Sequence, residues 1–235
     1  MEKANSERNQ SPLTRSSIRD HDDRMGSLDF KLAAFDMDGT VLEHNSSWVA
    51  IHRHFGTEHK GAASLRLYTE GKIGYREFMR RDISSWPRGV TRLEITKILS
   101  GYKLRREAPR VFDELRARGI RTALVTSGID ILAEEVAKKL RIDFWLANGL
   151  RFDKDGVILP KGVGRVDPTR KDLAYGRLLS RLGIPGKETI AVGDTIYDLA
   201  FLKSAGIGFM LAHTTRVPDP EIIHIDKLTD IFDHI

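Results

Sequence analysis

The chain has 235 residues, of which 40% are hydrophobic and 30% are charged, and its formal net charge at pH 7 is +5. These proportions are typical of a globular protein, and the length suits one large domain or one domain with an insertion. The absence of cysteine excludes disulfide frameworks, thiolate zinc sites and thiol catalysis. The sequence has no apolar run of about 18 residues, so we expect no membrane span. No secretory segment is visible in the first 27 residues, so a cytoplasmic protein is expected.

Residues 1–27 are polar and show neither a helical nor a strand period. Such a segment cannot bury enough apolar surface to offset the entropy lost on ordering. We therefore predict a disordered extension, with the functional domain beginning near Met25.

The segment from 31 to 43, KLAAFDMDGTVLE, is the first with a strong pattern. Its apolar run predicts a buried parallel-type strand, which ends at Asp36 and Asp38 before a turn at Gly39. Side chains two positions apart on a strand point the same way, so the two carboxylates should converge. At about 4 Å they would repel by about 4 kcal/mol at an effective dielectric constant near 20, which a divalent cation would relieve. Alone, this segment is equally compatible with a polar turn.

Residues 41–106 carry apolar side chains at helical spacing, interrupted by glycine and proline. We predict a helical insertion here, between core segments 28–40 and 107–235. The insertion holds thirteen Lys/Arg against six Asp/Glu, which could attract an anionic small molecule or nucleic acid, or could form a solvated surface. Its aromatic residues fall on buried stripes and not among exposed basic residues, which disfavours nucleic-acid binding. The stripes are Trp48, Ile51 and Phe55; Tyr75, Phe78, Met79, Ile83 and Trp86; and Ile95, Ile98, Leu99 and Tyr102.

From Ala108 onward the pattern alternates between strands and helices. This alternation predicts an α/β fold with a parallel sheet that is covered by helices on both faces. We expect strands at 120–125, 143–147, 189–192, 207–211 and 222–225, a hairpin over 150–159 that turns at Asp155-Gly156, and helices at 108–118, after Gly128, after Asp167-Pro168, at 196–205 and at the C-terminus.

Three of the predicted strands end in short polar segments. In open α/β sheets, ligands bind at the carboxyl ends of the strands, so these segments should gather at one site. In chain order they contain Asp36 and Asp38; Thr126, Ser127 and Gly128; and Asp194 with Asp198 four residues later.

The chemistry of these groups is complementary. Asp36, Asp194 and a backbone carbonyl near Asp38 are hard oxygen ligands that suit Mg²⁺. The Thr126 hydroxyl and the N–H groups of Ser127 and Gly128, which we expect at a helix start, would bind a phosphoryl oxygen. Lys171 lies in the first turn of a predicted helix. It is either a solvated lysine or the cation that balances these acids.

Four segments, DMDGT, VTSG, Lys171 and GDTIYD, resemble in order the signature motifs of the haloacid-dehalogenase (HAD) phosphatase superfamily. The match covers residues 31 to about 211. The insertion after the first motif and the hairpin at 150–159 resemble the phosphoserine-phosphatase-like branch, particularly its archaeal-type members. The resemblance implies a Rossmann-like core with a small helical cap inserted after the first strand.

The resemblance also implies a role for each residue of the motifs. Asp36 would attack phosphorus and form an aspartyl-phosphate, and Asp38 would protonate the leaving oxygen and then deprotonate water. Thr126 and Lys171 would hold the phosphoryl group. The implied Mg²⁺ set is Asp36, Asp38, Asp194 and Asp198, the last as an outer ligand or as the partner of Lys171.

In that branch, the cap is expected to bind the substrate amino group through an acid and the carboxylate through an arginine. These positions fall on Asn45, with Glu43 nearby, and on Asp82. Asp82 lies seven residues after Tyr75 on the inward stripe, where it would repel a carboxylate. It could instead contact a cationic or hydroxyl group of another phosphomonoester, or pair with an arginine inside the cap.

The sequence thus predicts a Mg²⁺-dependent phosphomonoester hydrolase that acts on a small phosphorylated metabolite, as a monomer or homodimer without a membrane partner. A phosphotransferase or mutase on the same fold is one alternative. A receiver-type phospho-acceptor domain is another, although that fold is shorter and has no helical insertion. A nucleic-acid-binding module ranks below both.

Overall fold

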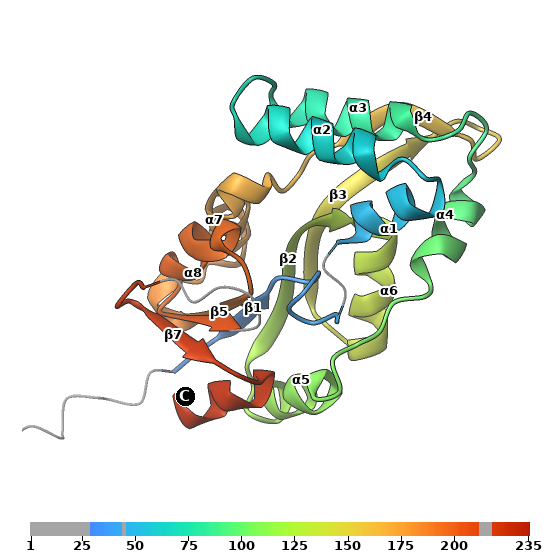
Figure 1. Ribbon diagram of the computed structural model, residues 1–235. Coiled ribbons are helices and arrows are strands. Elements are labelled where there is room, and N and C mark those ends of the chain that lie inside the picture. Colours follow the sequence, from blue (N-terminus) through green and yellow to red (C-terminus); the bar gives the residue numbers. More distant parts are fainter. Residues whose placement is uncertain (1–28, 44–45, 212–217) are drawn as a thin grey trace, which may run out of the picture.

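The computed structural model describes residues 29–43, 46–211 and 218–235 (Figure 1). The predicted disordered extension lies outside these ranges. A seven-stranded sheet runs through the structure in the order β4-β3-β2-β1-β5-β6-β7. Every neighbouring pair is parallel except β3 and β4, which are antiparallel. The strands are β1 Leu32–Phe35, β2 Arg121–Ile129, β3 Phe144–Phe152, β4 Ile158–Val163, β5 Thr189–Gly193, β6 Ile207–Leu211 and β7 Ile222–Ile225.

Strand β1 lies in the middle of the sheet. All four of its side chains are buried, two on each face. Ala33 and Phe35 join a hydrophobic cluster with α5 and α6, whereas Leu32 and Ala34 join a second cluster with α7 and α8. Helices therefore cover both faces, as predicted. They are α5 Ala108–Ala117, α6 Asp130–Leu140, α7 Lys171–Leu182 and α8 Leu199–Lys203.

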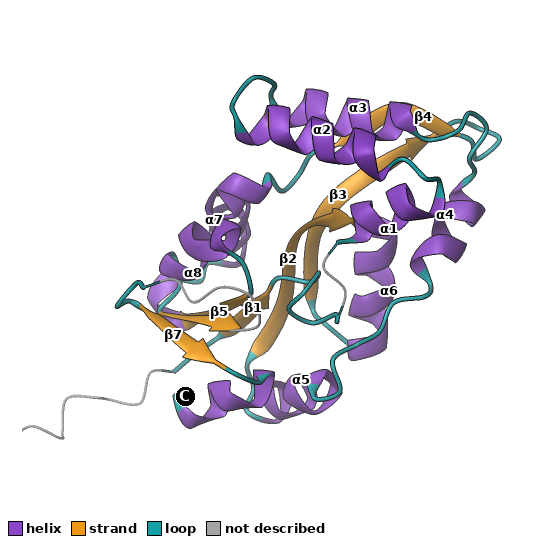
Figure 2. Ribbon diagram, in the orientation of Figure 1, coloured by secondary structure: helices purple, strands orange, loops and turns teal. Residues whose placement is uncertain are grey.

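Four helices lie between β1 and α5 in the chain. They are α1 Ser47–His54, α2 Glu58–Thr69, α3 Tyr75–Ser85 and α4 Arg92–Leu99. Helices α2 and α3 lie across the end of the sheet beside the long β3–β4 hairpin, as Figure 2 shows. The predicted stripe of α3 packs against Trp48 of α1, whose ring lies 5.9 Å from Trp86 and 6.4 Å from Phe78, centroid to centroid. The division into a core of 28–40 and 107–235 and a cap of 41–106 stays a prediction.

The structure differs from the predicted elements mainly at their ends. Strand β2 runs to Ile129, because Ile129 still pairs with Asn148 of β3 after a shift in register. Helix α6 therefore begins at Asp130, and the prediction that Ser127 and Gly128 stand at a helix start is wrong. The hairpin extends to Val163 and turns at Gly156 (φ 76°), as expected.

Four short 3₁₀ helices complete the described chain. They are η1 Pro168–Arg170, η2 Gly186–Glu188, η3 Ile196–Asp198 and η4 Leu228–Asp233. Asp167 caps η1 by accepting the Thr169 N–H, so the predicted cap and first-turn proline precede Lys171. Within the described residues, none of the helices has the length and apolar character needed to cross a bilayer.

Candidate active site

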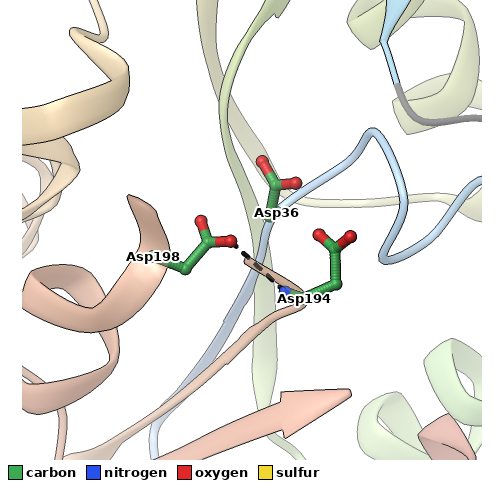
Figure 3. A group of neighbouring side chains, drawn as sticks. All are labelled: Asp36, Asp194 and Asp198. Atoms are coloured by element: carbon green, nitrogen blue, oxygen red, sulfur yellow. Dashed lines mark hydrogen bonds between the residues drawn. The ribbon is translucent and has the colours of Figure 1, made fainter. Parts of the chain in front are cut away.

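Three carboxylates converge at the carboxyl ends of β1 and β5 (Figure 3). Asp36 follows β1, Asp194 follows β5, and Asp198 ends η3. One oxygen from each lies within 4.8 Å of the others, and all three side chains are buried. The strand register explains this, since Phe35 pairs with Val192 and the two strands end side by side.

Lys171 lies against this cluster. Its Nζ donates to Asp36 Oδ1 at 2.6 Å and to Asp198 Oδ1 at 2.5 Å, and its side chain is buried. Burial alone would lower the pKa of the ammonium group, but Asp198 and Asp36 outweigh it and raise that pKa above its usual range. Lys171 is therefore a buried cation of the site and not a solvated lysine.

The charges in this group of four side chains do not balance. Three carboxylates face one ammonium group, which leaves a formal excess of two negative charges. Burial, with Asp198 next in importance, raises the pKa of Asp194 to about 6. Burial also raises the pKa of Asp36, against the opposing effect of Lys171. Oxygen donors with this excess charge fit a divalent cation such as Mg²⁺.

Hydroxyl and backbone N–H groups fix the orientation of the two later carboxylates. Asp194 Oδ1 accepts from the Thr40 hydroxyl at 3.0 Å. Asp198 Oδ2 accepts from the N–H groups of Asp194 and Thr195, while its Oδ1 faces Lys171. Gly39 (φ 88°) leaves room for this arrangement, because a Cβ atom there would lie 2.3 Å from Asp194 Oδ2.

The end of β2 lies beside β1, on the side opposite to β5. The Thr126 hydroxyl accepts the Gly128 N–H at 2.9 Å, so this N–H group has a partner within the strand. The Ser127 carbonyl accepts from Trp48 Nε1 at 3.0 Å and from Asn148 Nδ2 at 2.9 Å. Thr126 is buried and Ser127 half-buried, and both line the same cavity as Asp36.

This cavity has a volume of about 120 Å³. It brings together five predicted site residues from β1, β2 and α7, and it adds five that we did not predict. The predicted ones are Asp36, Asp38, Thr126, Ser127 and Lys171, and the added ones are Ser46, Trp48, Pro168, Thr195 and Tyr197.

Two predicted substrate contacts lie elsewhere. Glu43 is exposed at the start of the insertion and is not among the cavity-lining residues. Asp82 is buried in α3, with its Oδ2 3.2 Å from His52 Nε2 of α1. Its partner within the helical insertion is thus an imidazole and not the arginine that we had considered. Asn45 lies outside the described residues.

Sequence reasoning missed three residues that organise the site. Ser47 bonds to Asp38, and Arg105 donates to the carbonyls of Gly39 and Thr40. The buried Asn148 side chain bonds to Ser127, to the Tyr75 hydroxyl and to the Arg165–Val166 backbone. Its place directly after the predicted strand 143–147 was a weak signal for Asn148. For Ser47 and Arg105 the sequence offered none.

A sequence model described as a haloacid dehalogenase-like hydrolase matches residues 30–206. This match spans most of the chain, and the chain therefore belongs to the haloacid dehalogenase-like hydrolases.

Its relatives place it more narrowly. It is 29% identical over 204 residues to the phosphoserine phosphatase of Methanocaldococcus jannaschii, covering 84% of this chain and 92% of the relative. It is also 29% identical to the phosphoserine phosphatase of Albidiferax ferrireducens, with 87% and 90% covered. A solved structure of a substrate-bound phosphoserine phosphatase superposes with a TM-score of 0.72 at 25% identity, covering 88% of this chain and 98% of that one. The chain is thus similar to phosphoserine phosphatases over most of its length, and the predicted superfamily, fold and enzyme class are confirmed.

Proposed function

We propose that this protein hydrolyses phosphomonoesters with the help of Mg²⁺ and through an aspartyl-phosphate intermediate. The observation that carries the proposal is the cavity at the ends of β1 and β2. It exposes two carboxylates of one strand end, Asp36 and Asp38, to the same space as the Thr126 hydroxyl and the Lys171 ammonium group. A nucleophile, an acid and two groups that bind phosphoryl oxygens thus share one small volume.

The residues divide the reaction into two steps. An Asp36 oxygen attacks phosphorus, and the bond from phosphorus to the ester oxygen breaks as Asp38 gives that oxygen its proton. Asp38 then takes a proton from water as the water oxygen attacks the aspartyl-phosphate, which releases inorganic phosphate and restores the Asp36 carboxylate. Lys171 and Thr126 hold the phosphoryl oxygens while charge moves between the attacking and leaving oxygens.

Asp36, Asp194 and Asp198 would hold the Mg²⁺ ion, with a backbone carbonyl near Asp38 as the further ligand expected from the sequence. When bound, the ion supplies positive charge to the phosphoryl oxygens. Asp198 also orients Lys171 through their hydrogen bond, so this carboxylate serves both the cation site and the phosphoryl site.

We propose a small phosphorylated metabolite as substrate. Among the described residues that line the cavity, Lys171 is the only basic side chain, and it already bonds to two carboxylates. This lining favours a phosphomonoester without a carboxylate over phosphoserine. A substrate contact by Glu43 or Asp82 stays a prediction, and for Asp82 the buried His52 partner favours a role inside the cap. A monomer or homodimer is likewise still a prediction.

Hydrolysis of p-nitrophenyl phosphate, with and without Mg²⁺, tests the proposal. Asp36→Asn should lower kcat by at least about 10⁴-fold, because the amide cannot act as the nucleophile. Asp113→Asn is the matched control, since Asp113 is an exposed aspartate in α5. After acid quenching, the wild type should retain phosphate in an acyl-phosphate bond and Asp36→Asn should not. Full activity of Asp36→Asn would contradict the covalent mechanism.

A further inference from the structure

The first residue of α1 joins three segments of the active site. Ser47 is buried, and both its backbone N–H and its hydroxyl donate to Asp38 Oδ2, at 3.0 and 2.8 Å. The hydroxyl oxygen also accepts the N–H of Ile129, the last residue of β2, at 3.1 Å. Ser47 therefore connects Asp38 to a helix of the insertion and to the end of a core strand.

Chemistry fixes the direction of these hydrogen bonds. A backbone N–H can only donate, so the Ser47 oxygen is the acceptor for Ile129. The single hydroxyl proton of Ser47 therefore points to Asp38. Together the two bonds hold Oδ2 from two directions, so Ser47 sets the orientation of the Asp38 carboxyl group.

The start of α1 is built for this contact. The first N–H groups of an α-helix have no partner within the helix, and the positive end of the helix favours a nearby carboxylate. Ser46 caps the helix by accepting the Val49 N–H. The neighbouring Ser47 N–H is then left for Asp38. Two consecutive serines thus serve different partners.

The backbone of β2 lies close to the hydrogen bond between Ser47 and Asp38. A Cβ atom at Gly128 would lie 2.7 Å from Asp38 Oδ2 and 2.9 Å from Ser47 Oγ, which is closer than Cβ atoms are found in proteins. The absence of a side chain at Gly128 therefore lets the pair form against the strand. Trp48, the next residue of α1, bonds to the carbonyl of Ser127 and holds the helix start in place.

We propose that Ser47 is a positioning residue for Asp38. It keeps Oδ2 engaged and so holds the carboxyl group in the orientation in which it exchanges a proton with the leaving oxygen. This inference rests on the proposed function, in which Asp38 is the acid.

The test compares two aryl phosphates of similar shape, p-nitrophenyl phosphate and phenyl phosphate. The value of kcat/KM reports phosphoryl transfer to Asp36, the step in which the leaving group departs. p-Nitrophenolate departs readily without a proton, whereas the more basic phenolate depends on the acid. Ser47→Ala should therefore lower kcat/KM for phenyl phosphate by about 10-fold or more and that for p-nitrophenyl phosphate by less than about threefold. Ser47→Thr, which keeps the hydroxyl, should restore the wild-type ratio.

Two further variants separate positioning from a general loss of structure. Thr91→Ala removes the N-cap of α4, which accepts the Glu94 N–H at 3.2 Å away from Asp38, and it should leave the ratio of the two kcat/KM values unchanged. Gly128→Ala keeps Ser47 but pushes the pair apart, and it should reproduce the selective loss on phenyl phosphate. Thermal melts of each variant confirm that it is folded.

Equal losses on both esters in Ser47→Ala, or no loss on either, would overturn the inference while leaving the proposed function intact. If the wild type hydrolyses neither ester, the proposed function fails and the inference fails with it.

Discussion

The two sides of the site differ in the kind of side chain that they present. The core side, at the ends of β1, β5 and η3 and the start of α7, consists of buried charges in direct contact, three carboxylates and one ammonium group. The side that faces it, from α1 to α3, is aromatic and meets the core through neutral hydrogen-bonding groups. These are Trp48 Nε1 on the Ser127 carbonyl, the Tyr68 hydroxyl on Asp167, and the Tyr75 hydroxyl that accepts from Asn148.

This contrast separates two tasks. Buried like charges repel one another unless an opposite charge binds among them, so the excess negative charge of the core side favours a bound cation. The helical side has its one buried carboxylate, Asp82, beside His52, and it contributes Trp48 to the lining of the cavity. We therefore expect the core to set the reaction and the helices to set access and choice of substrate.

The largest expected effect comes from removing the one cation on the core side. Lys171→Met should lower the free energy of unfolding at pH 8 by about 3 to 5 kcal/mol, because it leaves buried carboxylates facing one another. The loss should shrink at pH 5, where these carboxylates take up protons. Urea denaturation measures both values. Lys138→Met is the control, since Lys138 forms an exposed pair with Glu134 and its loss should cost less than about 0.5 kcal/mol. Equal effects of the two variants would contradict the contrast.

A smaller effect on stability is expected from the pKa of Asp194, which is about 6 in the folded protein against a usual value of 3.8. A raised pKa means that the folded state binds the proton more tightly than the unfolded state. This contribution to stability is complete below pH 3.8 and is lost as the pH rises through about 6. Metal-free protein should thus lose about 2 kcal/mol of stability between pH 4 and 7 from this group.

Mg²⁺ should reverse that loss, so its stabilising effect should be greater at pH 7.5 than at pH 5. Thermal melts in EDTA and in Mg²⁺ at both pH values measure the difference. Asp194→Asn should flatten the pH dependence of the metal-free protein. The same Mg²⁺ effect at both pH values would show that the excess negative charge does not create the cation site.

The smallest effect is expected on the helical side. Asp82→Asn keeps the shape of the side chain and a polar contact to His52, and should cost about 1 kcal/mol of stability. Relative kcat/KM values for phosphoserine, phosphoethanolamine and glycerol 2-phosphate should stay in the wild-type order. A changed order would mean that Asp82 reaches the substrate, which is the alternative that its sequence position suggested.

The same contrast explains what could be predicted from the sequence. Apolar runs precede Asp36, Thr126 and Asp194, and parallel strands bring such ends together. The residues of the core side could therefore be predicted from local sequence patterns. The roles of Ser47 and Arg105 depend instead on contacts with backbone or side chains in other segments. Nothing in their own neighbourhoods indicates those contacts.

On the helical side, too, contacts between distant segments could not be predicted from the sequence. Periodicity correctly placed Asp82 on the buried face of α3, but its partner depends on how α1 packs against α3. The end of β2 was misplaced because glycine and serine after a strand usually signal a turn, whereas here pairing with β3 carries the strand to Ile129.

The hydrogen bonds that join the helices to the core have a kinetic consequence. Trp48 of α1 lines the cavity, so lifting the helices would widen the passage for substrate and phosphate. Breaking the contacts of Trp48, Tyr68 and Tyr75 costs about 1 kcal/mol each, which makes the open form a minor state. If this opening limits turnover, kcat on good substrates should fall in viscous solution, as for enzymes limited by product release.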